Sequence, residues 1–158
     1  MNKLSHISST GDANMVDVGA KSDSLRYARA RALVFVPQNV MDELRNLDFQ
    51  TKKGAVFQTA IIAGIMGAKK TPELIPLCHP LSLNKVNVEI NYVDGLIQIV
   101  CEASLTGKTG VEMEALTGAS IAALTVYDMC KAMSHDIAIK EIVLLEKTGG
   151  KNDYVREI

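Results

Sequence analysis

The chain has 158 residues, 47% of them hydrophobic, which is enough for one domain with an apolar core of its own. Its 17 basic and 18 acidic residues give a net charge of -1, which argues against a nucleic-acid-binding or membrane-surface protein. Three widely spaced cysteines argue against a disulfide framework, and neither a secretory signal nor an 18-residue apolar run is present. The sequence therefore predicts a cytoplasmic protein with no membrane partner.

The first half of the chain predicts a strand followed by two helices. The run from Ala28 to Val36 alternates and then becomes apolar, which indicates a strand. Pro37 fits the start of a helix that continues through QNVMDELRN. Residues 54–69 predict a second helix with one apolar side. Pro72 and Pro76 interrupt the chain after this helix, and a short helical turn is expected around TPELI.

The second half predicts a hairpin, a long helix and a last strand. Residues 86–92 alternate, the Asp-Gly pair at 94–95 supplies a turn, and residues 96–104 return as a strand. Apolar residues recur at helical spacing in the segment from Glu112 to about Met133, which predicts a long helix. Residues 137–146 indicate a strand, and Gly149-Gly150 begins a polar tail.

These elements follow the order β-α-α-β-β-α-β. If the two early helices form one crossover layer, the order becomes that of the ferredoxin-like folds. We expect an α+β protein with a four-stranded antiparallel sheet and helices packed on one face. Residues 1–25 are small and polar, and we expect them to form a mobile arm before a single domain at 26–158.

Two residues outside the long helix are candidates for chemistry. His79, in the loop segment LCHP, has a side chain suited to acid or base catalysis, and the alternative is a loop histidine with a backbone partner. Its neighbour Cys78 fits a small buried residue better than a nucleophile. Lys53 precedes the second helix, where a lysine either meets a bound anion or is solvated.

The stretch TGKTG before the long helix contains Gly-Lys-Thr but is not a Walker A loop. That motif needs a glycine five positions before Gly107, where this chain has Glu102. A glycine-rich turn that frees backbone N–H groups remains open. Glu112 and Glu114 follow in the first helical turn, where acidic residues ordinarily complement the helix dipole.

Asp128 and Lys131 lie three residues apart near the end of the long helix and hence on one face. They fit either a surface ion pair or a positioned acid–base couple. Glu114 and Asp128 are 14 residues apart, which is about 21 Å along a helix, so one small substrate cannot reach both. If both ends act, the site must combine two chains, and the sequence predicts a homo-oligomer with sites at the subunit interface.

Three long stretches carry a resemblance to a known family: HISSTGDANMVDVGAKSDSLRYARA, KKGAVFQTAIIAGIMGAKKTPELIPLCHPL and LTGKTGVEMEALTGASIAALTVYDMCKAM. Together they resemble the molybdenum cofactor biosynthesis protein C family, the cyclic pyranopterin monophosphate synthases. The resemblance implies a lyase that converts the cyclised dihydro-GTP intermediate (3',8-cyclo-7,8-dihydroguanosine 5'-triphosphate) to cyclic pyranopterin monophosphate and releases pyrophosphate. It also implies a ferredoxin-like fold and a hexamer built as a trimer of dimers, with active sites at the dimer interface.

The resemblance assigns site residues position by position. It implies catalytic roles for Asp128, Lys131 and Lys53. It implies substrate binding by Leu77, Cys78, His79, Glu112, Met113, Glu114, Arg26 and Lys21. Two positions depart from the family pattern, because Ala55 stands where many members carry an acid and Ile61 where many carry arginine.

The residues suggest a mechanism for this reaction. Lys53, Lys131, Arg26 and Lys69 would balance the triphosphate charge, so no cofactor is expected beyond Mg²⁺ that accompanies the triphosphate. Asp128 would orient Lys131, and a second cation would lower the pKa of Lys131 toward neutrality. His79 and Glu114 would hold the base and ribose.

Two other classes of function remain as alternatives. A small-molecule regulatory module would need a pocket but no acid–base couple. A nucleic-acid-binding protein would need a basic excess and stacking aromatic residues, which this composition lacks.

Overall fold

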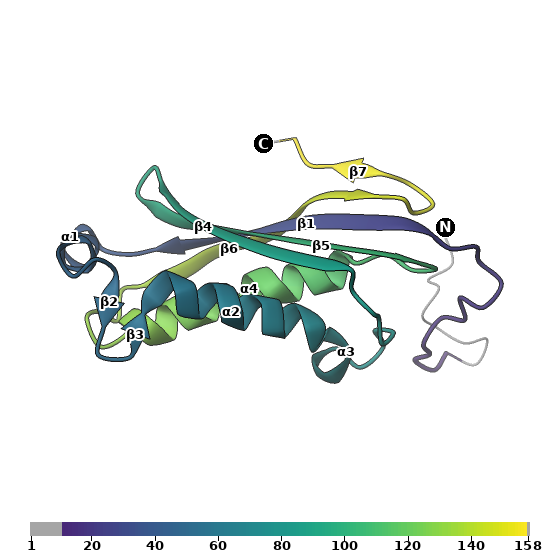
Figure 1. Cartoon of the computed structure of the whole chain (residues 1–158), viewed down its shortest axis with the longest axis horizontal. Helices are drawn as coiled ribbons and strands as arrows, with labels where there is room; N and C mark the ends of the chain where they lie inside the picture. The colour runs from purple at the N-terminus through teal and green to yellow at the C-terminus, as the bar shows by residue number, and fades with distance from the viewer. Residues whose placement is uncertain (1–10, 158) are drawn as a thin grey trace.

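The computed structural model describes residues 11–157 and is built around an antiparallel sheet (Figure 1). Residues 1–10 of the expected arm, and Ile158, lie outside the described residues. The sheet has the strand order β4-β5-β1-β6-β7, and every neighbouring pair is antiparallel. Its strands are β1 (Ser24–Phe35), β4 (Lys85–Val93), β5 (Leu96–Gly107), β6 (Ala138–Thr148) and β7 (Tyr154–Val155). The α+β class is confirmed, but the expectation of four strands is wrong, since the sheet has five.

The additional strand, β7, lies in the polar tail. Tyr154 pairs with Lys147 and Val155 with Glu146, and the backbone N–H of Arg156 donates to the carbonyl oxygen of Leu145 at 2.7 Å. A two-residue strand held by main-chain hydrogen bonds has no side-chain alternation to read. The sequence pattern therefore could not reveal it.

The central strand β1 follows the predicted alternation. Ala28, Ala30, Ala32 and Val34 are fully buried in the core, and the residues between them are less buried. On the alternate positions, Arg31 pairs with Glu141 of β6 at 2.7 Å. The strand predicted at 28–36 is confirmed and begins four residues earlier than expected.

The predicted hairpin is also confirmed. β4 and β5 are joined at Asp94 (φ 50°) and Gly95 (φ 82°), so both turn residues adopt positive φ. This is the conformation of a two-residue type I′ turn, which Asp-Gly favours.

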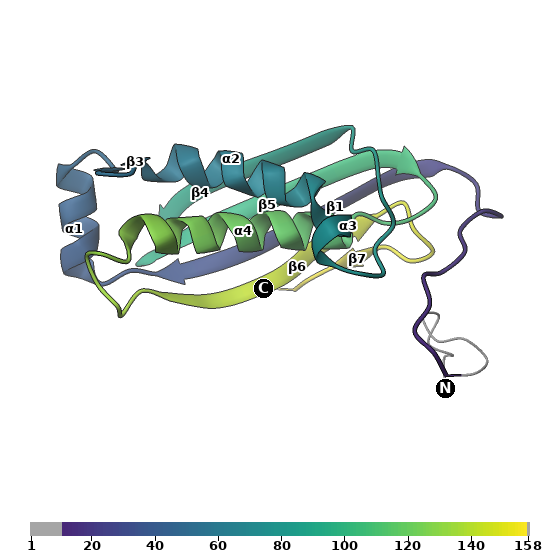
Figure 2. The same cartoon turned by 90° about the horizontal axis from the view of Figure 1, so that it is seen from below.

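Two helices, α2 (Val56–Lys69) and α4 (Glu112–Cys130), cover one face of the sheet, and Figure 2 shows them running side by side. Glycines allow them to approach closely. A Cβ atom at Gly64 would lie 3.0 Å from the carbonyl oxygen of Gly118, and one at Gly118 would lie 2.5 Å from Cys101 Sγ of β5. Larger residues at these positions would push α4 away from α2 and from the sheet.

The other helix of the early pair, α1 (Gln38–Asn46), does not join this layer. Figures 1 and 2 show it crosswise at one end of the sheet, where its buried Val40, Met41 and Leu44 close the core. Asp48 (φ 50°) and Phe49 (φ 53°) then turn the chain sharply into the small hairpin β2 (Gln50–Thr51) and β3 (Gly54–Ala55). Merging α1 with α2 was therefore wrong, because α2 alone is the first crossover helix.

The short helix α3 (Thr71–Leu74) follows α2, as the TPELI segment predicts. The succession β1, α2, β4, β5, α4, β6 reproduces the β-α-β-β-α-β order. The helix α4 is continuous from Glu112 to Cys130, and Figure 2 shows it running from the α3 end of the molecule to the α1 end. Most of the predicted site residues lie on or beside the two ends of α4.

Candidate active site

The described structure separates the predicted site residues into two groups, one at each end of α4. Because α4 is a continuous helix from Glu112 to Cys130, Glu114 and Asp128 lie about 21 Å apart along its axis. Within one chain, no small substrate can touch both groups.

At the C-terminal end of α4, Asp128 bridges two lysines, and we call these three residues the lysine cluster. Its Oδ2 atom lies 2.6 Å from Lys53 Nζ, and its Oδ1 atom lies 2.7 Å from Lys131 Nζ. The pair with Lys131 is the surface i,i+3 contact that the sequence allows. Lys53 comes from 75 residues away, so tertiary structure turns a local pair into a convergent cluster.

The β2–β3 hairpin positions Lys53. Thr51 Oγ1 accepts a hydrogen bond from the backbone N–H of Lys53 at 3.2 Å and donates to the carbonyl oxygen of Gly54 at 3.3 Å. Gly54 has a φ of 109°, which a residue with a side chain adopts only under strain. Lys53 therefore sits in a tight turn, and α2 begins only at Val56, so the expected helix N-terminal position is wrong.

Lys53 also binds the end of α4 itself. Its ammonium donates to the backbone carbonyl oxygen of Asp128 at 3.0 Å as well as to the carboxylate. The last carbonyls of a helix lack intrahelical partners, and a cation there complements the helix dipole. Lys53 thus fixes the hairpin against α4 while it completes the cluster.

The contacts set the charge state of the lysine cluster. Hydrogen bonds from Lys131 and Lys53 lower the pKa of Asp128 to about 2, so this carboxylate is ionised at neutral pH. In return, the hydrogen bond to Asp128 raises the pKa of Lys131. The expectation of a lowered Lys131 pKa is therefore wrong, because the carboxylate of Asp128 lies between the two ammonium groups.

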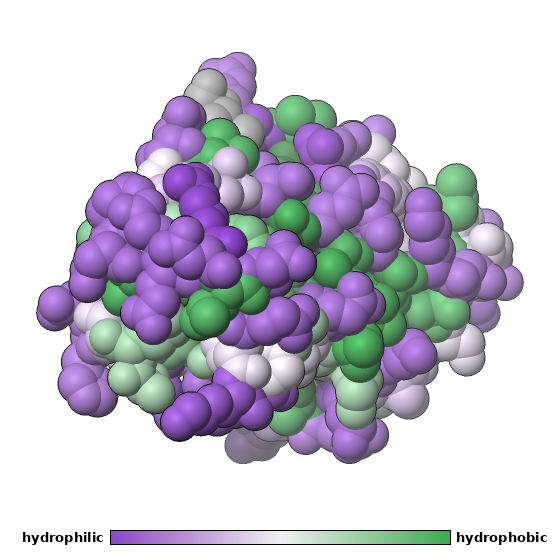
Figure 3. Space-filling view, turned by 60° about the vertical axis from the view of Figure 1, so that its left-hand side comes forward, coloured by the Kyte–Doolittle hydropathy of each residue, from purple (hydrophilic) through white to green (hydrophobic). Residues whose placement is uncertain are grey.

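An apolar hollow of about 420 Å³ adjoins the lysine cluster. Lys53 forms part of its wall, with Leu47, Met129 and Met133 among the apolar residues that line the rest. Figure 3, which turns the α1 end of the molecule toward the viewer, shows hydrophobic side chains gathered between hydrophilic ones on this side. The cluster is therefore flanked by a surface suited to the apolar faces of a ligand.

At the N-terminal end of α4, the predicted substrate-binding residues line a second hollow of about 310 Å³, which we call the histidine pocket. Here His79 Nε2 lies 2.7 Å from the carbonyl oxygen of Val16. Since a carbonyl only accepts, that ring nitrogen must carry the proton. The histidine pocket is lined by Leu77, Cys78, His79, Leu81, Thr109, Gly110, Glu112, Met113 and Glu114.

Glu114 is more than a dipole complement, because it is only 3% exposed. Burial raises the pKa of its carboxyl group, while a hydrogen bond with its own backbone opposes that rise. Burial likewise raises the pKa of Cys78, and the nearby Glu114 charge raises it further. A raised thiol pKa favours the unreactive thiol, in line with Cys78 as a packing residue.

Lys21 and Arg26 line a third hollow, about 150 Å³ in volume, which we call the basic pocket. It shares Thr109, Gly110 and Glu112 with the histidine pocket, so the two hollows adjoin. Three further lysines line it: Lys108, Lys147 and Lys151. The Gly-Lys-Thr stretch could have signalled Lys108, but Lys147 and Lys151 come from a strand end and the tail, where no motif marks them.

A protein-family model described as MoaC family matches residues 15–150. The chain belongs to the MoaC family. The resemblance noted in the sequence is thereby confirmed. Membership places this MoaC-family chain in molybdenum cofactor biosynthesis and associates it with an enzyme activity on a small molecule.

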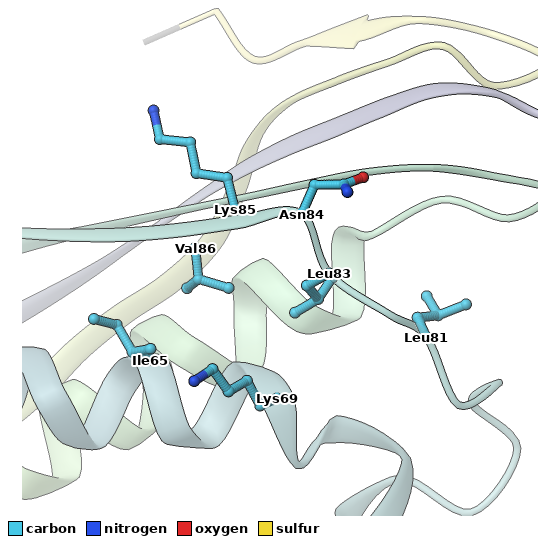
Figure 4. Close-up of a pocket in the computed structure, with 7 residues that line it drawn as sticks. All are labelled: Ile65, Lys69, Leu81, Leu83, Asn84, Lys85 and Val86. Atoms are coloured by element: carbon cyan, nitrogen blue, oxygen red, sulfur yellow. The ribbon is translucent and has the colours of Figure 1, made fainter.

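Lys69 lies apart from the other predicted residues of this MoaC-family chain. Figure 4 shows it on α2 beside a separate hollow, of about 400 Å³, with Leu81 and Leu83 in the segment that leads to β4. Val86 points toward the helices and Lys85 points away from them. Lys69 lines neither the basic pocket nor the apolar hollow beside the lysine cluster, so it joins neither group of predicted site residues.

Among residues 11–157, no group of three His, Cys, Asp or Glu side chains is placed to hold a metal ion. No helix in the same range is both long and apolar enough to span a membrane. At the two positions that depart from the family pattern, Ile61 packs partly buried against the core, and Ala55 is the N-cap residue of α2.

Proposed function

We propose that this MoaC-family chain converts the cyclised dihydro-GTP intermediate to cyclic pyranopterin monophosphate and pyrophosphate, as a phosphorus–oxygen lyase. The observation that supports this most directly is the lysine cluster, in which one ionised carboxylate holds two ammonium groups within 2.7 Å. Such a cluster presents two oriented cations to an anionic substrate. A regulatory module that only binds its ligand would need no acid–base couple of this kind.

The phosphate chemistry of this reaction requires positioning and charge. A substrate hydroxyl oxygen forms a bond to the α phosphorus, and the bond from that phosphorus to the oxygen that bridges to the β phosphorus breaks. Pyrophosphate leaves, and the hydroxyl proton passes to a base. Cations that are already oriented stabilise the charge that develops on the phosphate oxygens, without reorganisation during the step.

The ring rearrangement requires proton transfers, and the charge states suggest how they are divided. Lys131 is protonated at neutral pH, as lysines ordinarily are, and Asp128 raises its pKa further, so this side chain is suited to donate a proton rather than to accept one. Its proton can move only when the substrate reorganises the cluster. Protonated His79 Nε2 and the buried Glu114 are suited to hold the polar edge of the base and the ribose.

We further propose that the active site is shared between two chains. The lysine cluster and the histidine pocket lie about 21 Å apart on one helix, so a second copy must bring the missing half to each site. A hexamer arranged as a trimer of dimers meets this requirement. Light scattering coupled to size-exclusion chromatography tests it, and a monomer at assay concentration would rule it out.

We assign the chain to the ferredoxin-like folds. The β-α-β-β-α-β succession and the order β4-β5-β1-β6 of the four long strands support this assignment. In this view β7 is an addition at the edge of the sheet.

The proposed function is tested by turnover. Purified protein is incubated with the cyclised dihydro-GTP intermediate, and pyrophosphate and an oxidised fluorescent pterin are both quantified. Equal amounts of the two products are expected. An intermediate that binds but is recovered unchanged would refute the synthase activity and indicate a regulatory module.

Variants then connect turnover to the lysine cluster. Lys53→Ala and Lys131→Ala are each expected to lower kcat by roughly 10²–10³-fold, because each removes a cation from the reacting charge. Lys70→Ala is the matched control, since Lys70 makes only a loose surface contact with Glu73 at 4.0 Å. Full activity in either cluster variant, or an equal loss in the control, would contradict the assignment.

A further inference from the structure

We infer that Asn84 is a positioning residue for the histidine pocket. Its side-chain amide fastens the segment that carries residues 77–79 to the end of β5, although Asn84 itself does not line the pocket. The consequence for substrate binding rests on the proposed function. The effect on His79 rests only on contacts within the chain.

The segment that carries His79 has no regular structure of its own. Residues 75–84 connect α3 to β4 and contain neither a helix nor a strand. Leu81 and Leu83 pack partly buried against the core, and Figure 4 shows how the segment then joins β4 at Asn84. Because no ladder of main-chain hydrogen bonds holds this segment, the position of His79 depends on how its ends are attached.

At the end that leads to the histidine pocket, β5 extends further than β4 does. The pairing of the two strands begins with Lys85 opposite Ser104, whereas β5 continues to Gly107. The backbone N–H of Asn84 donates to the carbonyl oxygen of Ser104 at 2.9 Å, and its side-chain Oδ1 accepts from the backbone N–H of Thr106 at 2.9 Å. The side chain thus satisfies a main-chain donor beyond the point where β4 ends.

This hydrogen bond connects two walls of the histidine pocket. Three residues after Thr106, the glycine-rich turn contributes Thr109 and Gly110 to one wall, and residues 77–79 contribute to another. Asn84 lies on the second segment and binds the first. A side chain outside the pocket therefore helps to set the spacing of two walls inside it.

The N-terminal arm connects the same two walls on their other side. His79 Nε2 donates to the carbonyl oxygen of Val16 at 2.7 Å, and Lys108 Nζ donates to the carbonyl oxygen of Gly19 at 2.7 Å. Together with the bond made by Asn84, these contacts form a closed ring around the pocket. Without that bond, the walls are joined only through the arm, and the His79 ring gains freedom of orientation.

The orientation of His79 determines which of its ring nitrogens donates and which accepts. While Nε2–H is bound to the carbonyl oxygen of Val16, the neutral ring is held in one tautomer, with Nδ1 as the acceptor. If that bond is broken, the second tautomer becomes populated and the two roles are reversed. A ligand matched to one tautomer then binds only the fraction of chains that present it.

Long-range ¹H–¹⁵N correlation spectra of the neutral histidine rings test the inference in the absence of any ligand. The signals of His79 are identified by their loss in His79→Ala. The wild type is expected to show the tautomer protonated at Nε2. Asn84→Leu has a side chain of similar size but no acceptor, and it is expected to show a mixture of tautomers. A spectrum identical to that of the wild type would overturn the inference.

Two further variants separate the hydrogen bond from packing. Asn84→Asp keeps an acceptor oxygen for the N–H of Thr106 and should restore the single tautomer. Asn87→Leu removes an amide from the same strand, where it donates to Glu89 at 3.0 Å, and should behave as the wild type does. The bond of Asn84 is exposed, so all three variants should remain folded. Mixed tautomers in Asn84→Asp or in Asn87→Leu would assign the effect to the edge strand and reject the role of Asn84.

Turnover measured in parallel separates this inference from the proposed function. Asn84→Leu should raise KM for the intermediate about tenfold and leave kcat within about twofold, because the histidine pocket holds the substrate and the lysine cluster lies elsewhere. Asn84→Asp should restore KM. An unchanged KM despite mixed tautomers would refute the consequence for substrate binding.

The two proposals fail in different ways. If the intermediate is converted but the tautomer of His79 does not depend on Asn84, the positioning role is wrong and the synthase activity stands. If the tautomer depends on Asn84 as expected but the intermediate is returned unchanged, the positioning role stands and the synthase activity is wrong.

Discussion

The charged side chains at the two ends of α4 differ in both burial and pairing. At the C-terminal end, the carboxylate of Asp128 lies between two ammonium groups, and all three side chains are about half exposed. At the N-terminal end, Arg26 and Glu114 are both buried, and neither is paired with an opposite charge among the described residues. At the first end every charged side chain has an opposite charge beside it, although the cluster keeps a net charge of +1, and at the second end Arg26 and Glu114 have none among the described residues.

This difference indicates which end responds to a ligand. The lysine cluster has fixed charge states, because mutual hydrogen bonds keep Asp128 ionised and Lys131 protonated. At the N-terminal end of α4, a ligand that brings an opposite charge to the buried Arg26 or Glu114 would stabilise the structure. A substrate that spans both ends through two chains would bind mainly at the buried end and react at the cluster.

The largest expected effect tests whether the two ends belong to one site. Lys131→Ala and His79→Ala should each be inactive, but differently tagged copies co-expressed and purified together should recover activity. In a dimer with two shared sites, random pairing leaves about a quarter of the sites intact. Turnover of the intermediate measures the recovery.

The matched control combines two variants of the same end. Lys131→Ala paired with Lys53→Ala damages every shared site and should recover nothing. If the control pair recovered activity, or if the mixed pair recovered none, the two-chain arrangement would be ruled out. Light scattering confirms that each variant still assembles.

A smaller effect is expected from the hairpin that positions Lys53. Thr51→Val keeps the side-chain shape but removes both hydrogen bonds of the turn, so kcat should fall about tenfold through misplacement of Lys53. KM should change little, because Thr51 lies away from the buried end. Thr51→Ser retains the hydroxyl and should restore kcat, and a loss shared by both variants would point to packing instead.

At the N-terminal end of α4, the buried carboxyl group of Glu114 should make the free energy of unfolding depend on pH. Burial raises the pKa of Glu114, so the wild-type chain loses stability as pH rises from the unfolded value through the folded value. Glu114→Gln removes this loss and should be more stable than wild type near pH 7, with no advantage below about pH 4. Urea unfolding at several pH values measures it, and equal stabilities at all pH values would contradict the burial argument.

The smallest effect is expected at the exposed cluster. The lowered pKa of Asp128 gives a stabilisation that is present above its usual pKa and is lost as pH falls toward 2. Asp128→Asn should lack this dependence, with only a slight stability change at pH 7, because exposed ion pairs contribute little. If the stability of Asp128→Asn depended on pH more strongly than that of the wild type, the assigned charge state of Asp128 would be refuted.

Local patterns predicted much of the fold. The Asp94-Gly95 turn and the alternation on both sides of it determine the β4–β5 hairpin, and the apolar spacing of α4 predicted its first residue and its end to within three residues. The prediction failed where geometry depends on distant contacts. The placement of α1 depends on the turn at Asp48 and Phe49, and β7 on main-chain hydrogen bonds to β6.

The same distinction between local pattern and distant contact applies to the candidate site. Spacing alone placed Asp128 and Lys131 on one face and put Glu114 at the far end of the same helix. The sequence did not show that Lys53 would reach Asp128, because those residues meet only through the β2–β3 hairpin. It also misjudged the pKa of Lys131, since a shift depends on which charges end up nearest.

By itself, the sequence determined the features that depend on neighbours along the chain: strand alternation, the hairpin turn, the length of α4 and the motifs of the MoaC family. Tertiary structure alone decided which charges meet. It joined Lys53 to Asp128 across 75 residues and gathered Arg26, Lys108 and Lys147 around one pocket. The physical reason is that periodicity and turn chemistry act over a few residues, whereas charge pairing and burial depend on distances that only the packed sheet and helices set.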